Sequence, residues 1–363
     1  MIIFDILPAT SDQWVITFYF FLILSAVIGF AEFLSRSFKL TGEFTRKFVH
    51  VSVGVLVFIF SLFINNPQPL LFLCLIFSII NFFIIRFNLV PALNSNRKSY
   101  GTVFYPFAIF LAIIFLWTDF KIIFFNIILI LALADAMAAI VGQSIKKPIY
   151  FHVLQDKKSV QGSSSMFLSA LFIIIILHFF MADDIHLNFS ILIIAPALAF
   201  VITLAEAISS KGSDNLSISI ISGFFLFVFY FGDYNTQINV FYSIFFSVVF
   251  SITSIKLKFL SIDGALTAGM LAILMFSFGG WVWTIPLLTF FTLSSILSYT
   301  GKNQKQKLRL MYEKSSKRDA MQVLANGGLG IFFVLLNYIY SSDLLYYFYI
   351  ASLNFRHFRH FQF

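Results

Sequence analysis

The chain has 363 residues, of which 60% are hydrophobic and 11% are charged, and its formal net charge is +8. Soluble domains carry about 25% charged residues, so this composition excludes a soluble globular protein and predicts an all-α, polytopic integral membrane protein. The single cysteine, Cys74, excludes an internal disulfide and lies in a predicted span, where a packing role is expected.

Apolar stretches of the length that a bilayer requires recur along the whole chain, and we expect about twelve spans. They lie near residues 14–34, 48–64, 68–85, 103–118, 122–141, 165–181, 189–207, 216–232, 238–254, 264–279, 281–299 and 322–340. The first span follows Asp5 and Asp12 with no basic segment before it, which predicts a retained helix and not a cleaved signal peptide.

The basic residues follow every second span. Of the 24 lysines and arginines, all but Lys121, Arg356 and Arg359 lie in loops of one side. The positive-inside rule makes these loops cytoplasmic and places the N-terminus outside, and we expect a bacterial inner membrane. The basic segment 302–307 has no interleaved aromatic residues, so its partners are expected to be membrane lipids and not nucleic acid.

The second span begins with a charged helical face. Glu43, Arg46, Lys47 and His50 share this face because they are three or four positions apart. One interpretation is a capped helix start with a Glu–Arg pair and a lysine that extends to the membrane surface. The other is a cationic face that binds phosphate, in which the imidazole of His50 has a partner.

Asp135 lies inside the fifth span, about two turns from its cytoplasmic end. Its face of the helix carries the small residues Ala138, Ala139 and Gly142. They are compatible with a tight helix interface in which Asp135 is paired, and also with a ligand beside the carboxylate. Because acidic groups are costly inside a membrane, we favour a functional role for Asp135.

A basic loop follows this span. Lys157, Lys158 and Ser159 provide donors, and Gly162 lets backbone N–H groups approach phosphate oxygens. We predict that the loop, including Ser163, binds a nucleotide. Alternatively, Ser163 or Ser164 is simply the N-cap of the sixth span.

The seventh span carries Glu206 and leads into a polar segment with Lys211, Asp214 and Asn215. Asp214 has two interpretations: it caps the eighth span, or it holds Mg²⁺ together with Asp135 and the phosphates of a nucleotide. The sequence contains no Walker A motif, no kinase glycine-rich loop and no zinc-binding spacing, so a nucleotide-dependent enzyme would be of a membrane-embedded type.

Four segments in order resemble the motifs of the dolichol kinase/phytol kinase family, which is related to phosphatidate cytidylyltransferase. They are Glu43–Gly54, Ala134–Gly142, Lys157–Ser163 and Glu206–Leu216. The sequence departs from the family at Ala134, where glycine is common, and at Gln161, where glutamate is usual. The second change removes a possible metal ligand or proton acceptor.

This resemblance implies CTP-dependent, Mg²⁺-dependent phosphorylation of a long-chain isoprenoid alcohol such as phytol, geranylgeraniol or dolichol. It makes Asp135, Asp214 and Glu206 the candidate catalytic residues, with Asp135 and Asp214 at the metal. The candidate nucleotide- and substrate-binding residues are Arg46, Lys47, His50, Lys157, Lys158, Ser159, Gly162, Ser163, Lys211 and Asn215.

The remainder of the chain resembles a different family, the membrane proteins that include phytyl-phosphate kinase. The matching segments are Ser261–Gly269, Gly279–Trp283 and Lys317–Gly328. We therefore expect two domains, residues 1–235 and 236–363. The segment after Ile350 does not follow that family's pattern, so we expect the second domain to be truncated.

The candidate site residues of the second domain are Arg318, Asp319, Gln322 and Asn326. Arg318, Gln322 and Asn326 share one helical face, and the alternative is a capping arrangement from Ser316 to Asp319. The fusion suggests two successive phosphorylations of one lipid.

Three functions stay open at this point. The first is a lipid-alcohol kinase, the second a cytidylyltransferase that makes a CDP-activated lipid, and the third a transporter or lipid-binding membrane protein without catalysis. The site of phosphoryl transfer distinguishes the first two, because a kinase moves the γ-phosphate of CTP to the lipid and a cytidylyltransferase releases it in pyrophosphate.

Overall fold

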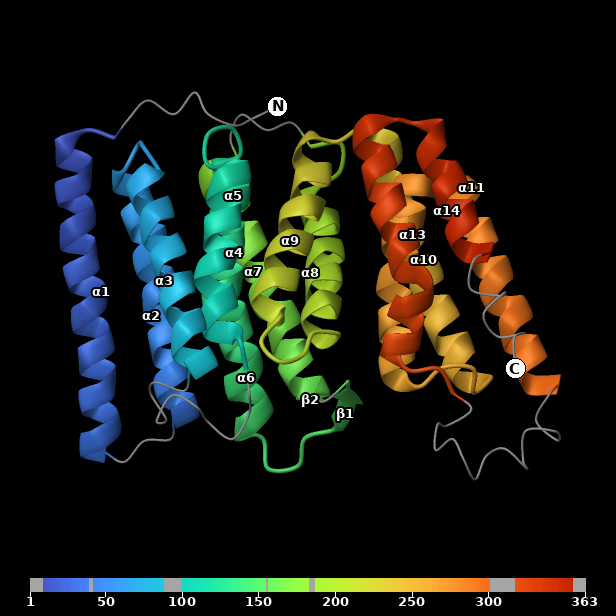
Figure 1. Ribbon diagram of the computed structural model, residues 1–363, viewed down its shortest axis with the longest axis horizontal. Helices are drawn as coiled ribbons and strands as arrows, with labels where there is room; N and C mark the ends of the chain where they lie inside the picture. The colour runs from blue at the N-terminus through green and yellow to red at the C-terminus, as the bar shows by residue number, and fades with distance from the viewer. Residues whose placement is uncertain are drawn as a thin grey trace. The chain divides into compact units, whose positions relative to one another are not determined.

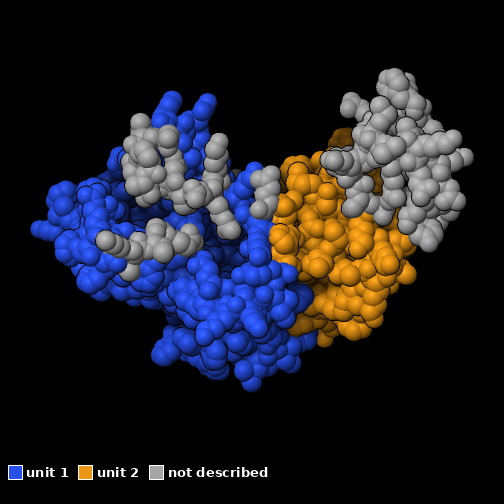
Figure 2. Space-filling view, turned by 90° about the horizontal axis from the view of Figure 1, so that it is seen from below, with its two compact units in different colours: residues 1–150, 155–231 blue, residues 151–154, 232–363 orange. Residues whose placement is uncertain are grey.

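The computed structural model describes residues 9–38, 42–87, 99–154, 156–182, 187–300 and 317–354, and it has the predicted all-α fold (Figure 1). Among these residues, nine helices are long and apolar enough to cross a membrane, and two shorter apolar helices cover Gly101–Leu116 and Ile191–Ala207. The chain is thus an integral membrane protein. It divides into two compact units (Figure 2), residues 1–150 with 155–231 and residues 151–154 with 232–363.

Unit 1 contains the predicted spans 1 to 8. Its elements are α1 (Ser11–Phe38), α2 (Gly42–Phe63), α3 (Gln68–Phe87), α4 (Gly101–Leu116), α5 (Lys121–Leu129), η2 (Ile130–Ala134), α6 (Asp135–Ser144), β2 (Asp156–Ser159), α7 (Val160–Met181), α8 (Ile191–Ala207) and α9 (Asp214–Phe231). The short strand β1 (Tyr150–Val153) precedes β2 in a two-stranded hairpin. The fifth predicted span is a continuous rod of α5, the π-helix η2 and α6.

The continuous helix formed by α5, η2 and α6 is the most buried span of unit 1. In its most apolar stretch 78% of the residues are buried, whereas the values for α1, α2, α3 and α7 lie between 17% and 28%. The outer helices therefore expose apolar side chains, as lipid-facing helices do. In Figure 1, α1, α3 and α6 all end at the lower end of unit 1, where the hairpin also lies, so the basic segments that follow these helices start at one end of the unit. This is the arrangement that the alternation of charge predicts.

Unit 2 consists of α10 (Tyr234–Lys256), α11 (Ile262–Thr300), α13 (Ala320–Tyr340) and α14 (Asp343–Asn354). Gly280 has φ 58° and ψ −156°, a conformation open to glycine and strained for other residues, and it breaks α11 into two halves. The halves correspond to the separately predicted spans 264–279 and 281–299, and both line the same cavity. The short helix α14 was not among the predicted spans.

Candidate functional site

The carboxylate of Asp135 is bound by a lysine from another helix. Asp135 is the first residue of α6 and is buried, with 6% of its surface exposed. Lys47, in the first turns of α2, places its Nζ 2.6 Å from Asp135 Oδ2 and 3.5 Å from the Asp135 carbonyl oxygen. The predicted phosphate-binding lysine and the predicted metal ligand are therefore an ion pair, which is also what the packing interpretation of Asp135 expects.

His50 lies one turn further along α2. Its Nε2 is 2.8 Å from the carbonyl oxygen of Leu131 and 3.6 Å from Asp135 Oδ2. Since a carbonyl only accepts hydrogen bonds, Nε2 carries the proton. The imidazole packs on the ring of Tyr105 with centroids 3.9 Å apart, and the Tyr105 hydroxyl donates to the His50 carbonyl. His50 thus has the partner that the sequence analysis expected, and that partner is the backbone before Asp135.

The basic loop packs on the small-residue face of α6. A side chain at Gly142 would come within 2.7 Å of Ser159 Oγ, and one at Gly162 within 2.7 Å of the Ala138 carbonyl. This close approach explains the small residues three and seven positions after Asp135. Ser159 is the N-cap of α7 and accepts from the Gly162 N–H at 3.1 Å.

The capping alternative for Ser163 and Ser164 was wrong, because α7 starts at Val160 and Ser159 caps it. The donor that was predicted for phosphate at Gly162 is used in this cap. The hydroxyl of Ser163 is buried without a hydrogen-bond partner among the described residues. Gln161, the departure from the family pattern, accepts from the Ile149 N–H.

A second buried ion pair lies in the same unit. Lys158 Nζ is 2.6 Å from Glu206 Oε1 and also donates to the Glu206 carbonyl oxygen. Burial lowers the pKa of the Lys158 ammonium, but Glu206, Asp214 and Asp135 act against burial and leave the pKa above its usual value. The contacts of Gly162 with Ala138, of Lys158 with Glu206 and of Asp156 with Lys211 place this loop beside α6, the end of α8 and the segment before α9.

Asp214 differs from the other two carboxylates. It is the first residue of α9, it is half-buried, and it forms no ion pair within the described part of the chain. Within the described ranges, its Oδ1 accepts one hydrogen bond, from the N–H of Asn215. It interacts electrostatically with Asp135, Lys158 and Lys47, so it belongs to the same cluster. Asp214 is the carboxylate best placed to take a new partner.

The segment between α8 and α9 is held by backbone contacts. The Lys211 N–H donates to Asp156 Oδ2 at 2.7 Å, and its carbonyl accepts from Tyr100. Gly212 has φ 86° and lies so close to Gly101 that a side chain would collide with it. The Asn215 amide donates to the Gly101 carbonyl at 3.0 Å, and its Oδ1 is buried without a partner among the described residues.

The remaining predicted residues of unit 1 lie at its surface. Arg46, Lys157 and Lys211 are exposed, and Lys157 Nζ lies 3.6 Å from the centre of the Tyr150 ring. Sequence reasoning missed Gly101, Tyr105 and Asp156, which position the site through backbone and ring contacts. Gly101 and Tyr105 lie in the first turns of α4 and Asp156 begins β2, and such residues are common at the starts of elements that have no site.

Two lysines and three carboxylates make the cluster, so it has an excess of one acidic group. All the candidate ligands are oxygens, as Mg²⁺ prefers, and Mg²⁺ commonly binds one or two carboxylates together with substrate phosphates. Within the described residues no three His, Cys, Asp or Glu side chains form a metal cage by themselves. The residues fit Mg²⁺ that is shared with a nucleotide, and the unpartnered Ser163 and Asn215 oxygens leave polar groups for a ligand or water.

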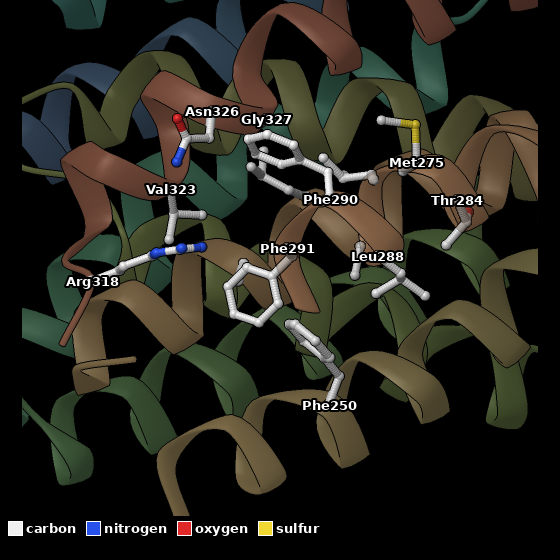
Figure 3. A pocket seen from close by; sticks show the side chains of 14 residues that line it. Phe250, Met275, Thr284, Leu288, Phe290, Phe291, Arg318, Val323, Asn326 and Gly327 are labelled. Carbon is white, nitrogen blue, oxygen red and sulfur yellow. The ribbon is translucent and has the colours of Figure 1, made fainter. Parts of the chain in front are cut away.

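Unit 2 contains a separate cavity of about 60 Å³ (Figure 3). Its wall is apolar except for Thr284, Arg318 and Asn326, and residues of both halves of α11 line it. The Arg318 guanidinium lies 5.3 Å from the centre of the Phe291 ring and forms no ion pair with a described carboxylate. An arginine without a carboxylate partner at an apolar cavity is a favourable site for an anion.

The other predicted residues of unit 2 have structural contacts. Asp319 is itself the N-cap of α13 and accepts from the Gln322 N–H at 2.8 Å, whereas the alternative expected a capping arrangement that runs from Ser316 to Asp319. Ser316 lies outside the described residues. Asp263 holds this helix start as well, because its Oδ2 accepts from the Ala320 N–H. Gln322 does not line the cavity, whereas Arg318 and Asn326 do.

Comparisons with known proteins agree with the motifs. Residues 245–357 match the family described as integral membrane protein DUF92. Phytol kinase from Synechocystis sp. (strain ATCC 27184 / PCC 6803 / Kazusa) is 29% identical over 214 residues, which cover 58% of this chain and 90% of that protein. A match of this length exceeds unit 2 and must include unit 1. No solved structure matches. Together these findings confirm the resemblance to phytol/dolichol kinase-like proteins.

Proposed function

We propose that unit 1 is a membrane-embedded phosphotransferase that moves the γ-phosphoryl group of CTP to the hydroxyl of a long-chain isoprenoid alcohol. The observation that carries this proposal is the cluster of Lys47, Asp135, Lys158, Glu206 and the unpaired Asp214 at one end of an apolar helical bundle. The similarity to a phytol kinase supports an isoprenoid alcohol as the acceptor.

The lysines of the cluster are neutralised by carboxylates before a nucleotide binds. The carboxylates of both ion pairs are buried and the lysines are half-buried, and a polyphosphate offers the lysines stronger, multiply charged acceptors. Nucleotide binding would therefore move Lys158 from Glu206 to the phosphates. The neighbouring Lys157, Arg46 and Lys211 are exposed and add positive charge on the nucleotide's side.

Asp135 and Asp214 would hold Mg²⁺, which supplies neutralisation of the phosphate charge when it is bound. In the transfer, the alcohol oxygen forms a bond to the γ-phosphorus, the bond from that phosphorus to the β–γ bridging oxygen breaks, and CDP leaves. Glu206, released by Lys158, accepts the hydroxyl proton, because Asp214 is committed to the metal. Phosphoryl transfer depends mainly on positioning and charge neutralisation, so one buried proton acceptor suffices.

The acceptor reaches this cluster from the membrane. The outer helices of unit 1 expose many phenylalanine side chains, against which an isoprenoid tail packs at no cost in polar desolvation. The cluster lies at the end of unit 1 where the basic segments begin, so we place the hydroxyl at the cytoplasmic surface of a bacterial inner membrane.

The test is transfer of label from γ-labelled CTP or ATP by the detergent-purified protein, with phytol, geranylgeraniol or a longer polyprenol as acceptor. The proposal expects label on the lipid with CTP. Label in pyrophosphate would instead identify a cytidylyltransferase that makes a CDP-lipid. Absence of nucleotide binding to the folded protein would favour a transporter or lipid-binding protein.

The cavity of unit 2 favours a second, separate function. Arg318 offers a cation to an anionic group, and the apolar wall offers contact to a chain. A volume of about 60 Å³ is far below the roughly 300–1,000 Å³ of drug-sized ligand pockets, so only a head group or a short part of a chain would enter. We propose that unit 2 binds a lipid with an anionic head group, such as an isoprenyl monophosphate.

A further inference from the structure

The helix that carries Asp135 departs from α-helical geometry in the residues directly before Asp135. Residues Ile130–Ala134 form a π-helix between α5 and α6. The N–H of Asp135 bonds to the carbonyl of Ile130, five residues back, and not to that of Leu131, its partner in an α-helix. A π-turn inserts one extra residue into an α-helix, and such turns are frequent at functional sites.

The Leu131 carbonyl, to which the Asp135 N–H would bond in an α-helix, instead accepts a hydrogen bond from His50. His50 Nε2 donates to the Leu131 carbonyl at 2.8 Å, so the π-turn gains a hydrogen bond from a side chain of another helix. Tyr105 packs on the imidazole ring and donates a hydrogen bond to the His50 backbone carbonyl, which fixes the position of the imidazole.

The contact face of α2 is shaped for this turn. Gly54 lies four residues after His50, and a side chain there would come within 2.3 Å of the Ala132 Cβ and 2.4 Å of the Tyr105 hydroxyl. Lys47, three residues before His50, binds the Asp135 carboxylate. One face of α2 therefore contacts the Asp135 carboxylate, the Leu131 carbonyl and the π-helical backbone at three successive positions.

We infer that His50 is a positioning residue, which holds the π-turn and thereby directs the Asp135 carboxylate to Lys47. If the turn relaxed to an α-helix, every residue after it would rotate by about 100° about the helix axis. Each side chain after the turn would then point where the side chain of the following residue points now. Asp135 would take the present direction of Ala136, which is 1% exposed. The activity part of this inference depends on the proposed function, and its structural part does not.

The structural part is tested by cysteine labelling, which the single, buried Cys74 permits. Met137 is 42% exposed, whereas Ala136 and Ala138 are 1% and 8% exposed. With N-ethylmaleimide, Met137→Cys should react quickly and Ala136→Cys slowly. Adding His50→Phe, which keeps a ring but removes the hydrogen-bond donor, should make Ala136→Cys the faster-reacting position. Adding His50→Gln, which keeps a donor, should leave Met137→Cys the faster one. Ser164→Cys, an exposed position in the first turns of α7, is the control that should not change.

The activity part is tested by steady-state kinetics with γ-labelled nucleotide. A misplacement of about 1 Å costs up to about 100-fold in rate, so His50→Phe should lower kcat by about that factor, with the KM for nucleotide changed less than about threefold. His50→Gln should recover most of kcat with an unchanged pH profile. A higher nucleotide KM at constant kcat would instead make His50 a phosphate ligand, and loss of one limb of the pH profile in His50→Gln would make it an acid–base group.

The two parts fail separately. An inactive wild-type protein with the expected labelling pattern would overturn the proposed function and leave the role of His50 in the turn intact. Identical labelling in the His50→Phe and unsubstituted backgrounds would overturn the inference even if the protein is an active kinase.

Discussion

Lys47 and Asp135 are 88 positions apart in the chain, yet Lys47 Nζ lies 2.6 Å from the Asp135 carboxylate. The pair joins the start of α2 to the start of α6 inside a mostly apolar bundle. Breaking a buried pair by removing one partner costs about 3–5 kcal/mol, because the other charge stays buried. The pair thus contributes to folding, and under the proposed mechanism it also contributes to catalysis.

Asp135→Asn should abolish transfer of the γ-phosphoryl group without unfolding the protein. The amide still accepts a hydrogen bond from Lys47 but does not neutralise it or bind Mg²⁺. We expect a lower apparent unfolding temperature in detergent and no labelled lipid. The control is Lys47→Met with Asp135→Leu, which removes both charges and should restore stability without activity. Full activity of Asp135→Asn would remove Asp135 from the mechanism.

The adjacent lysines of the loop allow a matched comparison. Lys158→Met should lower kcat/KM for the nucleotide by about 100-fold or more, because it removes a charge-assisted contact to phosphate and leaves Glu206 unpaired. Lys157→Met should change kcat/KM less than about threefold, since Lys157 is exposed and contacts Tyr150. Equal losses in the two variants would contradict a specific role for Lys158.

The raised pKa of Lys158 predicts how stability depends on pH. Because the folded value lies above the unfolded value of about 10.4, the ammonium contributes its full stability below about pH 10.4. This contribution disappears as the pH rises through the folded value. The difference in unfolding temperature between wild type and Lys158→Met should therefore be constant from pH 8 to 10 and shrink above that. A difference that grows with pH would contradict this sign.

Asp214→Asn should affect the metal and not the fold. Asp214 is half-buried and has no ion pair among the described residues, so we expect a stability change within about 0.5 kcal/mol. The Mg²⁺ concentration for half-maximal activity should rise by about 10-fold or more. Asp119→Asn, an exposed carboxylate between α4 and α5, is the control that should leave this concentration unchanged. An unaltered Mg²⁺ dependence in Asp214→Asn would leave Asp135 as the remaining candidate ligand.

The sequence predicts the spans well because apolar length and alternating charge record the membrane directly. The break at Gly280 is predicted for the same reason. Two spans that each cross the membrane and follow each other directly require the chain to reverse direction between them. The sequence also identifies the segments that form the site, but it does not predict how their side chains pair. Which lysine binds which carboxylate depends on how closely helices approach at Gly54, Gly142 and Gly212, and that approach is a property of the packed bundle.

The π-turn is the feature of the site that the sequence alone predicts least. The residues Ile130–Ala134 have no proline or glycine and read as ordinary helix, and the turn exists because α2 supplies His50 to the Leu131 carbonyl. The short helix α14 was not predicted for another reason: it has 12 residues, which is below the length that a membrane span requires.

Arg318 gives the clearest prediction for unit 2. Burial lowers the pKa of its guanidinium, and Phe291 provides a ring contact but no countercharge. Removing a partly buried charge that has no carboxylate partner relieves a desolvation cost, so Arg318→Met should leave the unfolding temperature unchanged or raise it. The same variant should bind geranylgeranyl monophosphate about 10–100-fold more weakly, the loss expected for a charged hydrogen bond, with no change for geranylgeraniol. Asp319→Asn, which preserves the helix cap, should change neither affinity. Loss of stability with unaltered binding of the monophosphate would show instead that Arg318 only packs against Phe291.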